Sequence, residues 1–262
     1  MDLELAGNIG IITASTSGLG KAATIALAKE GVNVVINGKD RVKLDSTAEE
    51  IHQKTKVEVL PIQGDITNRS TLKQIYRKTK DRFGKLDHLV TSAGGPPSGK
   101  TLETSEEDWY ESFNLLVMSV FRLVKFTAPL LRDGGGTIVT ITSRSVKEAL
   151  DSLVLSNSVR MGVIGLGKTL SRELGPEVRV NSVLPGPHRT PRIDGLIDQA
   201  LERGEYENRA EALESWSGGI PLDRLGNPDD LGSLVAFLSS PRADFINGAA
   251  IPVDGGSSRS NL

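Results

Sequence analysis

A short turn near the amino terminus carries the clearest chemical signal in this 262-residue chain. It follows an apolar run and opens a stretch with helical spacing, so backbone N–H groups and the positive end of a helix converge on it. Its residues are Thr13, Ala14, Ser15, Thr16, Ser17, Gly18, Leu19 and Gly20. Because glycine lets the backbone approach a diphosphate closely, the turn predicts a pyrophosphate site, with an ordinary strand-to-helix turn as the alternative.

A second signal follows the next apolar run, where Gly38 precedes Lys39 and Asp40. Dinucleotide-binding sheets usually present an acid to the adenosine ribose at this point, whereas a cation there pairs with a 2′-phosphate. Lys39 therefore favours NADP(H) over NAD(H), although Asp40 counts against this preference and Lys39 would also suit a solvated loop.

These residues need a framework that brings strand ends together, and the chain alternates short apolar runs with longer amphipathic stretches. The expected strands are 9–13, 32–36, 57–62, 86–91, 137–142, 179–184 and 250–253, and the expected helices are 19–30, 41–54, 70–83, 106–131, 153–174 and 228–238. This order predicts an α/β fold, a Rossmann-type doubly wound parallel seven-stranded sheet with helices on both faces.

No biased linker or fixed-period repeat divides the chain, so we expect one dinucleotide-binding domain over residues 1–262. The longest excursion, residues 190–221, contains its own helical pattern over residues 193–216. A connection of this length is usually functional, and we expect it to act as a substrate lid.

Composition excludes several classes of partner. The 31 basic and 33 acidic residues are interspersed, which argues against a nucleic-acid or membrane-surface partner. Residues 1–10 lack the basic and apolar pattern of a secretory signal and no run approaches ~18 apolar residues, so a cytoplasmic protein is expected. With no cysteine and three scattered histidines, no metal site is expected either.

Several motifs, taken in order and spacing, resemble the short-chain dehydrogenase/reductase family from end to end, and within it the 3-oxoacyl-carrier-protein reductase branch. Besides the turn, they are Gly64-Asp-Ile-Thr67, Ser92-Ala-Gly-Gly95, Thr140-Ile-Thr-Ser143, Asn181-Ser-Val-Leu-Pro-Gly186 and Val253-Asp-Gly-Gly256. The resemblance implies that Asp65 and Ile66 border the adenine, that Ser92, Ala93 and Gly94 line the cofactor, and that Pro185, Gly186, His188 and Thr190 hold the nicotinamide end. Ala14 and Ser92 stand where the family usually has glycine and asparagine.

The catalytic positions depart from the family further. The resemblance implies a tyrosine as proton donor, a lysine four residues later, a serine thirteen residues before the tyrosine, and an asparagine on an earlier helix. Here Ser143 is present, but Ser156, Arg160 and Leu116 occupy the other three positions. Asn114 lies two residues from Leu116, about 200° around a helix.

Hydride transfer leaves an alkoxide that needs a positioned acid, and a serine hydroxyl is a much weaker acid than a phenol. Other candidate acids are His188, Lys147 and Tyr206. One hypothesis is therefore an oxidoreductase of a small ketone or secondary alcohol, in which Ser143 polarises the carbonyl and Arg160 holds a proton-donating water, the cofactor ribose or a substrate carboxylate. The other is a catalytically inactive cofactor-binding protein that acts as a sensor, partner or assembly subunit.

The carboxy-terminal stretch, residues 220–256, matches the segment through which family members commonly associate. The resemblance therefore implies a homotetramer or homodimer.

Overall fold

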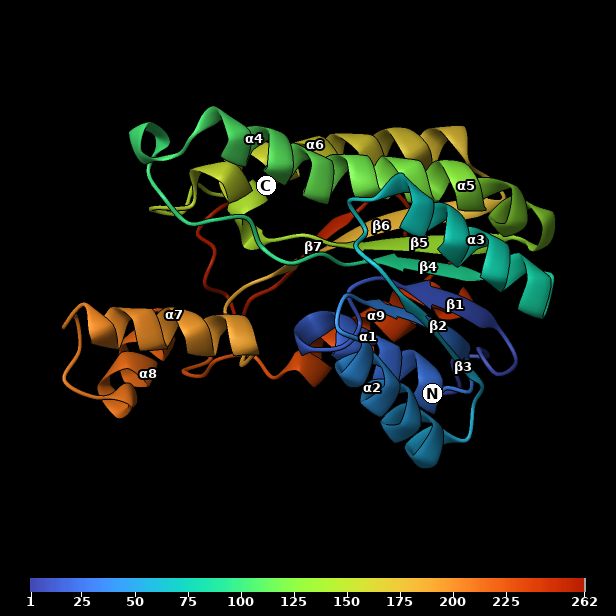
Figure 1. The fold of residues 1–262 in the computed structure, drawn as a ribbon, viewed down its shortest axis with the longest axis horizontal. Helices are drawn as coiled ribbons and strands as arrows, with labels where there is room; N and C mark the ends of the chain where they lie inside the picture. Colours follow the sequence, from blue (N-terminus) through green and yellow to red (C-terminus); the bar gives the residue numbers. More distant parts are fainter. Residues whose placement is uncertain (262) are drawn as a thin grey trace.

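The computed structural model describes residues 1–261 and contains a seven-stranded sheet whose strands are all parallel (Figure 1). Its order is β3-β2-β1-β4-β5-β6-β7. The strands are β1 Ile9–Ile12, β2 Asn33–Gly38, β3 Val59–Gln63, β4 His88–Thr91, β5 Gly136–Ile141, β6 Val178–Pro185 and β7 Ala250–Val253. Apolar runs such as Ile9–Ile12 form strands here because helices cover both faces of a parallel sheet.

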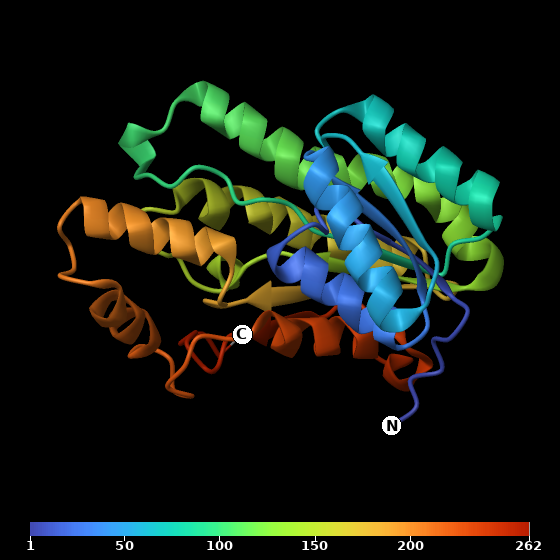
Figure 2. The same cartoon turned by 60° about the horizontal axis from the view of Figure 1, so that its bottom comes forward.

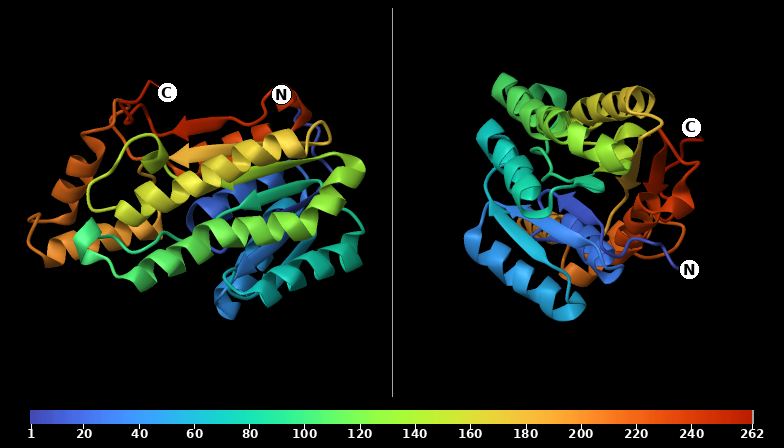
Figure 3. Two further views of the ribbon diagram at one scale, coloured as in Figure 1. Left: turned by 90° about the horizontal axis from the view of Figure 1, so that it is seen from above. Right: turned by 90° about the vertical axis from the view of Figure 1, so that its right-hand side faces the viewer.

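Helices form the two outer layers. The α-helices are α1 Gly18–Lys29, α2 Arg41–Thr55, α3 Arg69–Phe83, α4 Glu106–Phe113, α5 Ser119–Gly134, α6 Val154–Glu173, α7 Pro191–Glu202, α8 Arg209–Ser217 and α9 Pro228–Ser239. One layer contains α1, α2 and α9, and the other contains α3, α5 and α6 (Figures 1 and 3). This arrangement confirms the predicted Rossmann-type fold.

Two apolar cores fill the spaces between the sheet and its helix layers. Successive residues of a strand alternate between them: Ile11 belongs to the α3–α5–α6 side, and Ile12 to the α1–α9 side. Leu89 and Val90 divide in the same way on β4. The pleat of each strand therefore supplies both cores, which explains why neighbouring positions of a buried strand such as β1 are both apolar.

The segment 106–134 is long and apolar enough to cross a membrane by length and composition, but half of its most apolar window is buried inside the fold. It packs against α3 and α6 and is a core helix. Its middle, Asn114–Met118, forms a π-helix that joins α4 to α5, a departure from the uninterrupted helix expected over 106–131.

The excursion after β6 contains two helices, α7 and α8, which project from one end of the molecule (Figures 1 and 2). The single helical pattern expected over 193–216 was wrong in this respect. The break between them includes Gly204, whose φ of +69° is a left-handed conformation that ends a helix. Ile197, Ala200 and Ala212 are buried between the two helices, so apolar periodicity persists across the break.

Candidate cofactor and active site

The turn between β1 and α1 has the shape that a pyrophosphate site requires. Ser17, the N-cap of α1, makes no side-chain bond to the helix within the described chain, so the first N–H groups of α1 remain for a ligand. Gly20 permits the tight return of the chain, because a β-carbon there would lie 2.4 Å from the carbonyl oxygen of Ala14. Ser15 is fully buried, and its hydroxyl accepts a hydrogen bond from the N–H of Asn37 at 2.9 Å. The turn is therefore held to β2 as well as to β1.

Ala14 occupies a left-handed conformation, with φ at +47°. This conformation explains why a glycine would suit the position, since an L-residue has steric cost there. Ala14 accommodates the turn without blocking it, because the close contact falls on Gly20.

The end of β2 presents a cation beside the expected adenosine position. Lys39 is largely exposed, and its Nζ lies 3.6 Å from a carboxylate oxygen of Asp65. Partial burial alone would raise the pKa of Asp65, but hydrogen bonds from Thr67 and the charge of Lys39 hold that pKa below its ordinary value. Asp40 instead caps α2, where its carboxylate accepts from the N–H of Lys43 at 3.1 Å. The acid that argued against NADP(H) therefore has a structural role.

The loops after β1, β4 and β6 meet at one edge of the sheet. The hydroxyl of Thr13 donates to the carbonyl of Ser92 at 2.7 Å and accepts from the N–H of Ser92 at 2.9 Å. Thr190 approaches from the other side, with its Cγ2 3.6 Å from the β-carbon position of Gly18. Parallel pairing places the ends of neighbouring strands together, so residues predicted separately meet at one edge of the sheet.

The serines after β5 and on α6 form two hydrogen-bonded pairs. The Ser143 hydroxyl accepts from the N–H of Ser145 at 3.1 Å and caps the 3-10 turn Arg144–Val146. The Ser145 and Ser156 hydroxyls lie 3.0 Å apart, and both residues are buried. The sequence analysis did not single out Ser145 as a partner of Ser156. Its place two residues after Ser143 was the one feature of the sequence that pointed to it.

Arg160 lies one turn beyond Ser156 on α6 and is only 7% exposed. Its Nε has no hydrogen-bond partner among residues 1–261. Burial, together with the charge of Arg192, lowers the pKa of Arg160 to about 10, so its guanidinium is still cationic at neutral pH. A buried cation without a partner indicates a site built for a ligand.

The whole chain, not the turn alone, is similar to known reductases. Residues 13–258 match the family model described as enoyl-(acyl carrier protein) reductase. The chain is 30% identical over 256 residues to 3-oxoacyl-(acyl-carrier-protein) reductase of Thermotoga maritima, which covers 97% of this chain and 99% of that protein.

The chain belongs to the short-chain dehydrogenase/reductase family. Among solved structures, L-sorbose reductase from Gluconobacter frateurii, complexed with NADPH and L-sorbose, has a TM-score of 0.95 at 29% identity and covers 99% of this chain and 100% of that one. YwfH, an NADPH-dependent reductase involved in bacilysin biosynthesis, has a TM-score of 0.91 at 26% identity and covers 97% and 99%. The family membership makes the chain a short-chain dehydrogenase/reductase-type oxidoreductase with a nicotinamide cofactor.

The position predicted for the family's asparagine falls in the π-helix. Leu116 is buried there in the apolar core. The side-chain oxygen of Asn114 accepts a hydrogen bond from Arg122 at 2.6 Å. Arg122 also donates to the carbonyl of Thr67. Among the residues described, Asn114 therefore belongs to a contact between α5 and the loop before α3.

The alternative acids occupy varied positions. His188 is 3% exposed, and its Nδ1 lies 2.9 Å from the carbonyl of Gly186, so Nδ1 carries the proton and Nε2 has none to give. Burial lowers the pKa of His188, which keeps this neutral form at pH 7. Tyr206 lies between α7 and α8, with its hydroxyl 3.3 Å from that of Ser215. Lys147 ends the 3-10 turn after Ser143.

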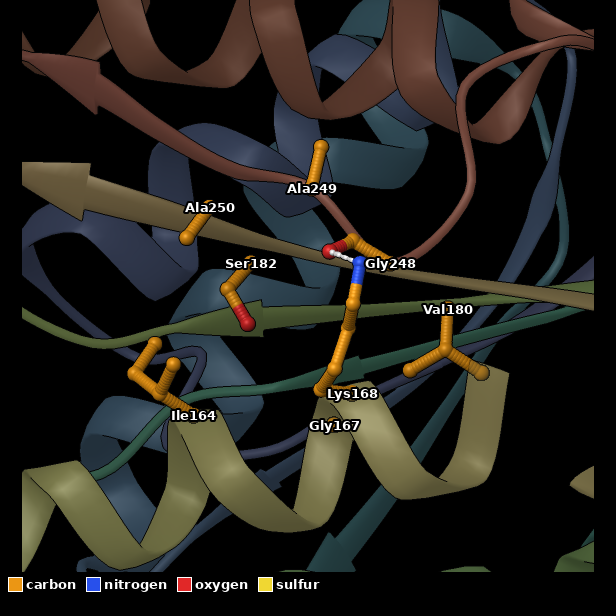
Figure 4. A pocket seen from close by; sticks show the side chains of 8 residues that line it. All are labelled: Ile164, Gly167, Lys168, Val180, Ser182, Gly248, Ala249 and Ala250. Carbon is orange, nitrogen blue, oxygen red and sulfur yellow. Dashed lines mark hydrogen bonds between the residues drawn. The ribbon is translucent and has the colours of Figure 1, made fainter. Parts of the chain in front are cut away.

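A cavity of about 270 Å³ lies elsewhere, between α6 and the β6–β7 edge of the sheet (Figure 4). It is lined by Ile164, Gly167, Lys168, Val180, Ser182, Gly248, Ala249 and Ala250. Lys168 closes one side by donating to the carbonyl of Gly248 at 3.1 Å. None of these lining residues belongs to the predicted cofactor or catalytic set. Among residues 1–261 no cluster of metal-binding side chains occurs either.

Proposed function

We propose that this chain is an NADP(H)-dependent oxidoreductase that interconverts a small ketone and a secondary alcohol at an atypical site made of Ser143, Ser156 and Arg160. The observation that carries the proposal is the buried, unpartnered Arg160 beside the serine cluster, at the sheet edge that holds the pyrophosphate turn. Structural relatives that use NADPH support the choice of cofactor.

The residues present fit a nicotinamide dinucleotide. The close return at Gly20 and the uncapped first turn of α1 suit its pyrophosphate. We assign the remaining contacts to Lys39 for a 2′-phosphate, to Asp65 and Ile66 for the adenine, to Ser92, Ala93 and Gly94 along the groove, and to Pro185, Gly186, His188 and Thr190 at the nicotinamide. When bound in its reduced form, this group supplies a hydride.

Reduction of a ketone consumes one hydride and one proton, so the protein must polarise the carbonyl and deliver the proton. Ser143 donates a hydrogen bond to the carbonyl oxygen. Arg160 stabilises negative charge on that oxygen and orients a water molecule that gives up the proton. Ser156, paired with Ser145, positions the first turn of α6 beside them.

Single-turnover mixing with NADPH and a panel of small ketones tests the proposal, with loss of nicotinamide absorbance as the readout. Ser143→Ala is expected to slow oxidation of NADPH about 10²-fold or more, with unchanged NADPH affinity. Ser233→Ala, at an exposed position of α9, is the control. No oxidation across the panel would contradict the proposal.

The second candidate function, an inactive cofactor-binding sensor, partner or assembly subunit, is favoured by the contact that already engages Ser156 with Ser145. It predicts NADPH binding without oxidation. It also predicts that Ser156→Tyr together with Arg160→Lys creates activity where the natural chain has none.

We propose the cytoplasm as its compartment and a homodimer or homotetramer as its assembly. Exposed apolar side chains support association: Tyr110, Phe113, Phe121 and Met161 on α4 to α6, and Leu222 and Phe245 in the carboxy-terminal stretch. Light scattering is expected to give two or four times the 28.0 kDa chain mass, and a monomer would contradict this.

A further inference from the structure

Arg160 is a buried cation on α6. Within residues 1–261 no hydrogen bond or ion pair joins its guanidinium to another group, although more than nine-tenths of the residue is buried. Burying a cation is costly unless an anion meets it. The fold therefore retains an unbalanced positive charge in the active site.

Arg192 brings the second cation from the lid. It lies in the first turn of α7, and its Nη2 reaches across to donate to the carbonyl of Pro96 at 3.1 Å. Its guanidinium rests on Gly95, because a β-carbon there would lie 2.3 Å from Cζ. Only glycine gives the guanidinium this place in the loop that follows β4.

The positive charges of Arg160 and Arg192 repel each other, so an anion bound between them would be stabilised by both. Arg192 is near enough for its charge to disfavour the charge on Arg160, in addition to burial. Arg192 is exposed as a whole residue, yet burial of its guanidinium lowers its pKa as well. In the described part of the chain, neither arginine forms an ion pair with a carboxylate.

We propose that Arg160 and Arg192 together bind a carboxylate of the substrate, which makes the substrate an oxo acid or the corresponding hydroxy acid. The inference rests on the proposed oxidoreductase function. A planar guanidinium offers paired N–H donors that match the two oxygens of a carboxylate. Capture of the carboxylate ties α7 to the body of the molecule and places the neighbouring carbonyl beside Ser143.

A phosphate of the cofactor is the other source of an oxyanion. Thr190, two residues before Arg192, lies over Gly18 in the pyrophosphate turn. Arg160, however, lies on α6 one turn after Ser156, whose hydroxyl meets Ser145. The shared anion site is therefore on the side of the serines, where the reacting carbonyl is expected.

The test measures binding of unreactive probes to the protein saturated with NADP⁺, by calorimetry and thermal shift. Oxalate and malonate are expected to bind and raise the Tm, whereas the neutral diamides oxamide and malonamide are not. Arg192→Gln and Arg160→Gln are each expected to weaken oxalate binding at least tenfold, with Arg192→Lys intermediate. Arg203→Gln removes the same charge from the exposed end of the lid and is expected to change nothing.

Separate titrations with NADPH alone distinguish the two sources of the oxyanion. Arg192→Gln is expected to change the NADPH Kd less than twofold. A tenfold loss of NADPH affinity would assign Arg192 to the cofactor phosphate and overturn the proposal, as would equal binding of acids and diamides or no binding of either. If oxalate binds but no oxo acid oxidises NADPH, the carboxylate site stands and the proposed oxidoreductase function fails.

Discussion

At the scale of single residues, the site combines conserved geometry with unusual side chains. In the turn, Ala14 has a left-handed backbone conformation, and Gly20 lies where a β-carbon would collide with the backbone. Ser145 then engages Ser156, at the position where the resemblance predicts a tyrosine. The turn proposed for the cofactor and the serines proposed for catalysis are thus separate groups of residues, so single substitutions can change one without the other.

The strain at Ala14 predicts that Ala14→Gly stabilises the protein. A left-handed L-residue costs roughly 1–2 kcal/mol, and the greater flexibility of an unfolded glycine returns part of this, so a gain of about 0.5–1 kcal/mol is expected. Urea denaturation measures it. Ala48→Gly, inside α2, is the matched control and is expected to cost about 1 kcal/mol. Destabilisation by both variants would contradict the assigned strain.

The proposed contact of Lys39 with the 2′-phosphate predicts a preference for NADPH over NADH. Lys39→Ala is expected to weaken NADPH binding about fivefold, or ~1 kcal/mol for an exposed charge, and to leave NADH binding unchanged. Fluorescence titration with both cofactors checks this. Lys43→Ala removes an equal charge from the exposed face of α2, and an identical effect from that variant would show that only net charge matters.

At the scale of elements, α7 and α8 form a unit that has few contacts with the rest of the molecule. Arg209 on α8 is hydrogen-bonded to Asp198 at 2.6 Å and also to Asp194, and both acids belong to α7. Arg192 provides a contact from α7 to the loop after β4. The pairing of α7 with α8 is therefore distinct from the attachment of α7 to the cleft.

Removal of Arg209 is expected to loosen α8 from α7. Exposed pairs contribute little individually, so Arg209→Ala should cost about 1 kcal/mol and accelerate limited proteolysis of residues 203–208 about fivefold. The NADPH Kd should not change. Arg203→Ala breaks a pair with Glu205 inside the same connection and should not have this effect. Equal cleavage of both variants would contradict the role of Arg209.

At the scale of the whole molecule, folding buries a histidine that joins neighbouring strands of the sheet. His88 on β4 is 4% exposed; its Nδ1 donates to the Thr137 hydroxyl at 2.9 Å, and its Nε2 accepts from Asn8 at 3.0 Å. Burial is the main cause that lowers the pKa of His88 to about 4. The folded protein therefore requires the neutral form.

This requirement predicts a loss of stability in acid. In the unfolded chain His88 has the ordinary pKa of about 6.5, whereas in the folded chain its pKa is about 4. As the pH falls from about 6.5 to about 4, the unfolded chain binds a proton at His88 that the folded chain does not bind, so the free energy of unfolding decreases. His88 should account for about 2 kcal/mol between pH 7.5 and pH 5, measured by urea denaturation at each pH. His88→Gln should flatten the slope, although His188 retains a contribution of the same sign. An unchanged slope would refute the assignment.

The sequence by itself determined the parallel α/β sheet, and it predicted the turn for the pyrophosphate and the replacement of three family catalytic residues. These features are local or periodic: buried strands are rich in apolar residues, glycine marks a close return, and motif spacing aligns the chain with its family. For that reason the seven strands and most helix positions could be predicted, with small differences at their ends.

Only the tertiary structure decided which side chains meet. Asp40 caps a helix, Ser156 contacts Ser145, and Arg192 reaches from α7 to the loop after β4. No local pattern encodes such contacts, because they depend on where separate loops arrive at one edge of the sheet. The break between α7 and α8 likewise depended on backbone geometry, since the apolar spacing continues through it.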